Sequence, residues 1–128
     1  MSKTTEMLRA EEHEFHEEPC HGGKGAWYFK DIIQNASEKK IIRYIHDDIL
    51  PPGSSFGVHS HARAETECIE EEWYICLSGH GTMILDGQEM PFGEGDANVC
   101  RNGGSHGIYN NSNENMRFLV IYARCSSL

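Results

Sequence analysis

Apolar and polar residues alternate along much of this chain, in short runs separated by turn-forming residues. Successive side chains on a β-strand point to opposite faces, so this alternation predicts strands with one buried and one solvent-facing side. No segment repeats apolar residues strongly at the spacing of a helix. The expected strands cover residues 39–46, 54–61, 72–77, 82–85, 97–100, 105–109 and 116–123.

Turn signals and the two chain ends complete the predicted architecture. Asp86-Gly87 lies between TMIL and QEM and predicts a two-residue hairpin, because both positions tolerate a positive φ. Residues 26–33, AWYFKDII, are apolar enough for a further strand, either within the chain or exchanged with a partner subunit. Residues 1–25 are polar and acidic, and we interpret them as an N-terminal arm over the barrel or a partner, or as a disordered segment. The fold class is therefore all-β, with a single sandwich or barrel domain over residues 26–128.

Composition limits the classes of partner. A chain of 128 residues is long enough for one domain with its own core. The net charge of -9 argues against nucleic acid as a partner, because phosphates need clustered Lys and Arg. No apolar run approaches the ~20 residues that span a membrane, and residues 1–9 lack the apolar stretch of a secretion signal, so we expect a cytoplasmic protein without a membrane partner. The five cysteines have no paired spacing and indicate free thiols.

His59-Ser60-His61 is the pattern with the clearest chemical meaning. Two histidines one residue apart project from the same face of a strand, which places their imidazoles side by side. A carboxylate from Glu72 and a third imidazole from His106, arriving from other strands, would complete a four-ligand site for a divalent transition metal. Such a site would keep coordination positions for water or a substrate.

The spacing around these residues resembles the two motifs of the cupin superfamily. The first motif is a glycine, five residues, His-x-His, a gap, Glu, six residues and a glycine, and it is matched from Gly53 through His59, His61 and Glu72 to Gly79. The second motif runs from a glycine through Pro-x-Gly and His to Asn. It is matched by Gly95, Gly103, His106 and Asn110.

The chain departs from these motifs in two places. Arg101 stands where the family usually has proline, so the turn before His106 is less rigidly preset. Ten residues, 62–71, separate His61 from Glu72 where the family usually has three or four. Glu65 lies at the family's usual distance from His61 and is the alternative carboxylate. We favour Glu72, because it keeps the distance to Gly79 and begins a predicted strand.

The resemblance implies a cupin-type double-stranded β-helix, that is, a jelly-roll barrel, with His59, His61, Glu72 and His106 as metal ligands inside it. If these ligands point inward, strand alternation predicts that Gly57, Tyr74, Ile108 and Asn110 do so as well. We predict that Tyr74 and Ile108 contact a bound small molecule, whereas Asn110 supports a turn or the ligands. The catalytic residues stay unassigned.

The remaining histidines and one arginine have weaker patterns. His13, His16 and His21 lie in the acidic arm and are interpreted as solvent-exposed, and His46 and His80 have no partner at ligand spacing. Arg101 either lies at the rim of the pocket, where it would attract an anionic substrate, or is an exposed turn residue.

Three functional hypotheses follow. The first is a small metal-dependent enzyme that acts on a carboxylate- or hydroxyl-bearing metabolite by oxygenase, decarboxylase, lyase or isomerase chemistry. The second is a non-catalytic protein that binds an anion or sugar with the help of the metal, and the third is a metal-free structural barrel. The ligand set suits one Fe, Mn, Ni, Zn or Cu ion per subunit. Resemblance to small cupins further implies a homodimer.

Overall fold

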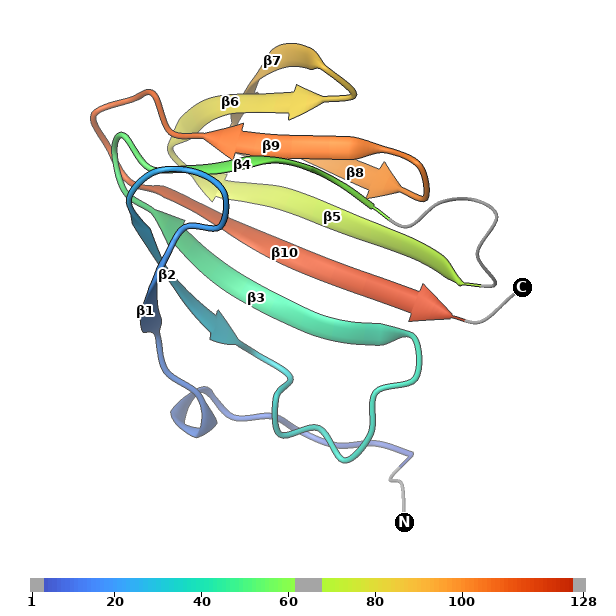
Figure 1. Ribbon diagram of the computed structural model, residues 1–128. Coiled ribbons are helices and arrows are strands. Elements are labelled where there is room, and N and C mark those ends of the chain that lie inside the picture. Colours follow the sequence, from blue (N-terminus) through green and yellow to red (C-terminus); the bar gives the residue numbers. More distant parts are fainter. Residues whose placement is uncertain (1–3, 62–67, 126–128) are drawn as a thin grey trace.

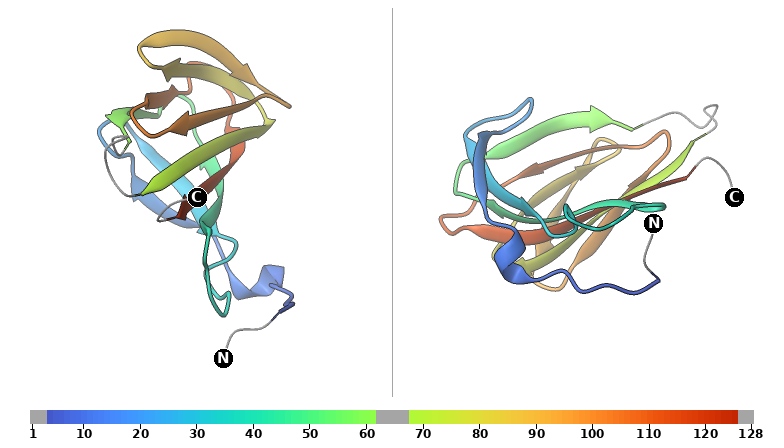
Figure 2. Two further views of the ribbon diagram at one scale, coloured as in Figure 1. Left: turned by 90° about the vertical axis from the view of Figure 1, so that its right-hand side faces the viewer. Right: turned by 90° about the horizontal axis from the view of Figure 1, so that it is seen from below.

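Two antiparallel β-sheets face each other in the computed structural model, which describes residues 4–61 and 68–125 (Figures 1 and 2). One sheet has six strands in the order β1-β2-β3-β10-β5-β8, and the other has four in the order β4-β9-β6-β7. The all-β prediction is confirmed. The strands are β1 (His16–Pro19), β2 (Ala26–Asp31), β3 (Ile42–Leu50), β4 (Ser55–Ser60), β5 (Ile69–Ser78), β6 (His80–Leu85), β7 (Gln88–Gly93), β8 (Ala97–Arg101), β9 (Ser105–Tyr109) and β10 (Met116–Cys125).

Helix is almost absent from the described residues. The single helical element among them is the three-residue 3-10 turn η1 (Ala10–Glu12). No helix in this part of the chain is long and apolar enough to cross a bilayer.

Most predicted strands are present, and their bounds shift where pairing partners extend them. β9 has the predicted limits, whereas β3 begins three residues later than expected and continues to Leu50 because its last residues pair with the start of β10. β5 begins at Ile69 because its first residues pair with the end of β10. The predicted hairpin joins β6 to β7, with φ of 50° at Asp86 and 81° at Gly87.

β1 is a strand that the sequence pattern did not predict. Its residues, HEEP, are all exposed and show no apolar alternation. Pairing with β2, from His16 opposite Phe29 to Pro19 opposite Ala26, makes this segment a strand. Part of the N-terminal arm therefore forms the edge of the six-stranded sheet, and β2 pairs within its own chain with β1 and β3.

The glycines of the two motifs are needed for backbone conformation. Gly53, Gly79, Gly95 and Gly103 all have φ between 78° and 87°, where a side chain would strain the backbone. At Gly79 a Cβ would also lie 2.4 Å from the carbonyl oxygen of Asn115. The turn with Arg101 in the proline position forms without a proline, closed by a 2.9 Å hydrogen bond from the Gly104 amide to the Arg101 carbonyl.

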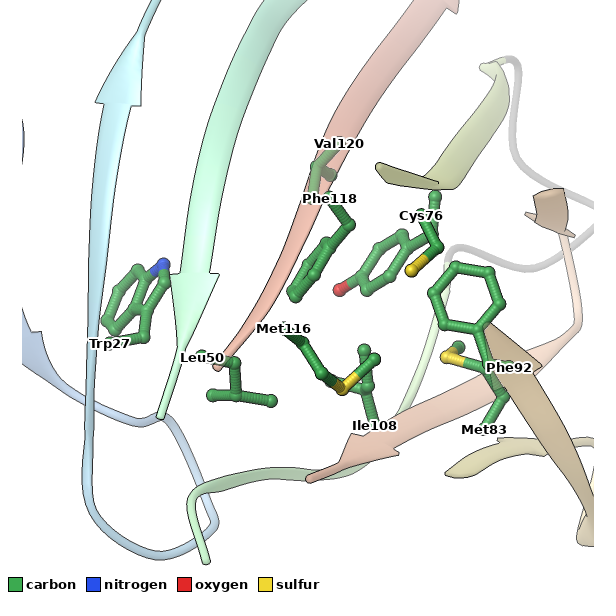
Figure 3. Packing of buried hydrophobic residues seen from close by; sticks show 10 residues of the cluster. Trp27, Leu50, Cys76, Met83, Phe92, Ile108, Met116, Phe118 and Val120 are labelled. Atoms are coloured by element: carbon green, nitrogen blue, oxygen red, sulfur yellow. The ribbon is translucent and has the colours of Figure 1, made fainter. Parts of the chain in front are cut away.

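The hydrophobic core fills the space between the sheets. Leu50 and Phe118 from the larger sheet and Met83 and Ile108 from the smaller one are almost completely buried, and Figure 3 shows them pointing into this space. All five cysteines are free, as expected, and Cys76 and Cys100 are buried.

Asn110 organises a turn, as predicted. Its side-chain amide donates hydrogen bonds to the carbonyls of Leu50, at 2.8 Å, and Glu114, at 2.7 Å. Its side-chain oxygen accepts from the amide and hydroxyl of Ser112. Because Asn110 is fully buried, these bonds fix the connection from β9 to β10.

Candidate metal centre

The four predicted metal ligands meet between the two sheets. His59 lies on β4, His61 directly follows β4, Glu72 lies on β5 and His106 lies on β9. One ligand atom from each residue lies within 4.8 Å of all the others. Glu72, the favoured carboxylate, belongs to this cluster, and the alternative Glu65 lies outside the described residues.

Strand pairing explains the convergence. His59 and His106 are direct partners in the β4-β9 ladder, so their side chains leave the smaller sheet side by side. Glu72 lies on β5 of the opposing sheet, where β10 separates β5 from β3 and β8 is its other neighbour. The cluster therefore exists only when the two sheets are packed together.

The imidazole nitrogens of the cluster are unusually close. The Nε2 atom of His106 lies 3.0 Å from Nε2 of His61 and 3.1 Å from Nε2 of His59. The Oε1 atom of Glu72 lies 3.1 Å from the His106 nitrogen and 3.4 Å from the His61 nitrogen. These four atoms are arranged as ligands around a common centre.

Hydrogen bonds at the outer nitrogens decide which atoms carry lone pairs. Nδ1 of His61 faces Glu70 Oε1 at 3.0 Å, and Nδ1 of His59 faces the carbonyl oxygen of Gly57 at 3.2 Å. Both oxygens are acceptors, so both Nδ1 atoms must donate, and a neutral ring then has its lone pair on Nε2. The Nε2 lone pairs of His59 and His61 thus point toward a common centre. A bound cation stabilises this arrangement, whereas two neutral rings facing each other do not. The residues fit a metal ion.

The surroundings of Glu72 favour the ionised form of its carboxylate. Burial by itself would raise its pKa, but hydrogen bonds involving His106, His61 and Tyr44 outweigh burial and hold the pKa well below its usual range. The Tyr44 hydroxyl donates to Oε2 and leaves Oε1 facing the imidazoles. A carboxylate held ionised in this way suits a divalent cation.

The two histidines of the first motif have different proton affinities. The pKa of His61 is raised, mainly by its hydrogen bond to Glu72 and against the effect of burial, and Glu70 adds to the increase. The pKa of His59 is lowered, mainly by burial. Of these two histidines, His61 is therefore the one from which a metal ion would chiefly have to displace a proton.

The prediction that Gly57 points inward with the histidines is wrong. The β4-β9 ladder shifts register between Phe56 and His59, so Phe56 packs against the core instead. A Cβ on Gly57 would lie 2.1 Å from the carbonyl oxygen of Gly22, so this position faces the loop before β2. The irregularity breaks the simple alternation on which the prediction rested.

A cavity of about 180 Å³ adjoins the metal ligands. His59 and Glu72 contribute to its wall, and Tyr74, predicted to contact a ligand, does so too. Ile108, the other predicted contact, is in the core and is not part of the wall. The other lining residues are His21, Trp27, Tyr44, His46, Asp48, Phe56 and Val120.

Sequence reasoning missed most of this wall. Tyr44, His46 and Asp48 alternate on β3, so their spacing could have indicated one inward face. His21 is exposed, as interpreted, and it also lines the cavity, with its ring centroid 5.3 Å from that of Trp27. Arg101 is not in the wall of this cavity. Its side chain is exposed and pairs with the Glu71 carboxylate at 3.1 Å.

A match to a family model agrees with the motifs and the fold. Residues 47–122, more than half of the chain, match the model described as Cupin domain. This chain belongs to the cupin superfamily.

The chain is also similar to individual proteins over most of their length. It is 32% identical over 100 residues to the oxalate-binding protein of Thermotoga maritima, covering 78% of each chain. It superimposes with a TM-score of 0.80 and 28% identity on a crystal structure of a predicted oxalate decarboxylase from Thermotoga maritima, covering 92% of this cupin and 98% of that chain. The polyketide cyclase RemF from Streptomyces resistomycificus, at 19% identity, shares the fold with a TM-score of 0.72 over 95% of this chain and 80% of its own.

Proposed function

We propose that this cupin is a small metalloenzyme that acts on a carboxylate- or hydroxyl-bearing metabolite, with one divalent transition metal ion held by His59, His61, Glu72 and His106. The observation that carries the proposal is the pair of imidazole lone pairs fixed toward one centre by the hydrogen bonds at Nδ1 of His59 and His61. A bound metal would act as a Lewis acid that polarises an oxygen of the substrate.

The chain's own residues supply the remainder of the site. Tyr44 holds the Glu72 carboxylate in place through its hydroxyl. Tyr74 lines the cavity, with its ring 5.2 Å from that of His106. Because burial raises the pKa of Tyr74 well above its usual value, its phenol stays protonated and can donate a hydrogen bond to a substrate oxygen.

The proposal is tested first by metal content. Elemental analysis of protein purified without added metal should show a divalent transition metal near one equivalent per chain, and His61→Ala and His106→Ala should lose most of it. His80→Ala is the matched control, since His80 is exposed and outside the cluster. Full metal occupancy in both cluster variants, with folding intact by circular dichroism, would remove the proposed ligand set.

Turnover distinguishes the enzyme from a binding protein. The metal-loaded protein is screened with small hydroxy and keto acids, oxalate included, for oxygen uptake, carbon dioxide release and product by NMR. Turnover that disappears in His106→Ala supports an enzyme.

A non-catalytic role is the second candidate, and the relative named as an oxalate-binding protein favours it. In that case small carboxylates would bind the metal-loaded protein and remain unchanged. Binding without turnover across the whole screen would favour this alternative over the enzyme.

A further inference from the structure

The wall of the cavity carries polar groups besides the proposed metal ligands. β3 presents Tyr44, His46 and Asp48 to the cavity, and β2 contributes Trp27. None of these four is a metal ligand. Tyr44 is engaged with Glu72, and of the other three residues Asp48 and Trp27 carry buried polar atoms without a regular hydrogen bond.

Two of these polar atoms are buried without a partner. Neither Oδ1 of Asp48 nor Nε1 of Trp27 has a partner at regular hydrogen-bond geometry, although both residues are only 3% and 5% exposed and the Trp27 N–H is close enough to the Asp48 carboxyl to lower its pKa. The nearest cationic candidate, Nδ1 of His46, is 3.9 Å from Asp48 Oδ1, which is beyond hydrogen-bond distance. Buried polar groups are nearly always paired, so an acceptor and a donor left open on one cavity indicate a missing ligand group.

The charges around the cavity limit what that group can be. Among the lining residues within the described ranges, 4–61 and 68–125, there is no Lys or Arg, and two carboxyl groups, Asp48 and Glu72, are present. Burial raises the pKa of Asp48 well above its usual range, although the Trp27 indole N–H opposes this. The part of the cavity beside Asp48 is therefore unfavourable for a second carboxylate group on the ligand, because no cationic side chain would balance its charge.

We propose that Asp48 and Trp27 recognise a hydroxyl group at the end of the substrate opposite to its metal-binding oxygen. This inference rests on the proposed function, since it assumes a metal-bound substrate. A hydroxyl accepts from the Trp27 N–H and donates to Asp48 Oδ1 at once, and it does so whether or not the carboxyl carries a proton on its other oxygen. A carboxylate could only accept, and an ammonium group could only donate.

Aromatic walls and volume define the rest of the substrate. The Trp27 ring stacks on Phe29 with centroids 4.9 Å apart and meets Phe56 edge-on at 5.0 Å. Tyr44 and His46 stack at 4.3 Å on the β3 side. A cavity of about 180 Å³ equals the liquid volume of roughly six water molecules, so the substrate is a small hydroxy acid or hydroxylated ring rather than a nucleotide or an oligosaccharide.

Pairs of ligands that differ by one hydroxyl test the proposal. Protein loaded with Mn²⁺ is titrated by calorimetry with 3-hydroxypropanoate, 4-hydroxybutanoate and 3-hydroxybenzoate, each against its deoxy parent. We expect at least one hydroxy acid to bind about tenfold or more tightly than its parent, because a site built to pair a hydroxyl rejects the analogue without it. Trp27→Phe keeps the ring and removes the N–H, and Asp48→Leu removes the carboxyl; both should bring the ratio close to one.

Control variants separate recognition from folding and from metal binding. Asp48→Asn keeps the shape and an acceptor oxygen and should keep part of the preference even if Asp48→Leu folds poorly. Asp47→Asn, whose side chain pairs with Arg117 instead of lining the cavity, should leave the ratio unchanged. Metal content is measured for every variant.

Two results would overturn the inference separately from the proposed function. With metal fully bound, either equal binding of every hydroxy acid and its parent, or an unchanged preference in both Trp27→Phe and Asp48→Leu, would exclude this role for the two residues. Wild-type protein that binds none of Mn²⁺, Fe²⁺, Ni²⁺, Cu²⁺ and Zn²⁺ would overturn the proposed function and this inference with it.

Discussion

The Glu70 carboxylate holds the imidazole of His61, with Oε1 of Glu70 3.0 Å from Nδ1 of His61. The other carboxylate oxygen of Glu70 accepts a hydrogen bond from the Tyr122 hydroxyl at 2.6 Å. Glu70 thus fixes both the orientation of the ring and the nitrogen that carries its proton, and it leaves Nε2 for the metal.

Replacing this carboxylate should weaken metal binding without unfolding the protein. In Glu70→Gln a neutral amide faces His61, so the ring is a poorer ligand and metal affinity should fall about 10- to 100-fold. Glu71→Gln is the matched control, because Glu71 pairs with Arg101 at the surface. Competition with a chromophoric chelator measures both affinities, and equal values for the two variants would contradict this role of Glu70.

Glu72 and Glu65 should differ sharply as metal ligands. Glu72→Gln removes the charged ligand from the cluster and should lower metal affinity at least about 100-fold, more than the loss of a group that only orients a ligand. Glu65→Gln should bind metal like the wild type. The same chelator competition decides between them, and a larger loss in Glu65→Gln would transfer the ligand role to that residue.

Neighbouring aspartates on β3 should have opposite effects on stability. Asp48 is buried with Oδ1 unpaired, so Asp48→Asn should raise the free energy of unfolding of the metal-free protein at neutral pH by about 1 kcal/mol. Asp47 accepts hydrogen bonds from Arg117 at 2.6 and 2.9 Å, so Asp47→Asn should lower it by about 1 kcal/mol. Urea unfolding checks both values. A destabilised Asp48→Asn protein would show that the carboxyl has a partner that stabilises the fold.

Asp48 should also make stability depend on pH. Because burial raises its pKa in the folded state, the folded protein binds more protons than the unfolded chain above about pH 4. The free energy of unfolding should therefore fall as pH rises from about 4 toward neutrality, which is opposite to the contribution of Glu72, whose pKa is lowered. The contribution of Glu72 is common to wild type and Asp48→Asn. We expect the difference between the two proteins, measured with a chelator present, to widen with rising pH; a constant difference would refute the buried-acid interpretation.

Strands could be predicted from the sequence where alternating apolar and polar residues, or a turn motif, determine the local structure. The strand at 105–109 was predicted with its exact limits, and the Asp86-Gly87 hairpin formed as expected. β1 was missed because none of its side chains is buried, so it has no pattern of its own and exists through pairing with β2. Gly57 was misplaced because a register shift in β4 is set by the facing strand.

The residues of the candidate site likewise fall into those that the sequence indicates and those that only the structure reveals. The sequence alone singled out the four residues of the candidate metal centre, because they match the spacing of the cupin motifs. Only the tertiary structure decided that Glu70 orients His61 and that His21, Trp27, His46 and Asp48 form the cavity wall. Glu70 lies on β5, whereas the four wall residues lie within residues 21–48, and apart from the alternation on β3 they carry no local signal of function. Trp27 and Asp48 lie on neighbouring strands of one sheet, and the pairing of β2 with β3 brings this buried donor and this buried acceptor to one cavity that neither strand could form alone.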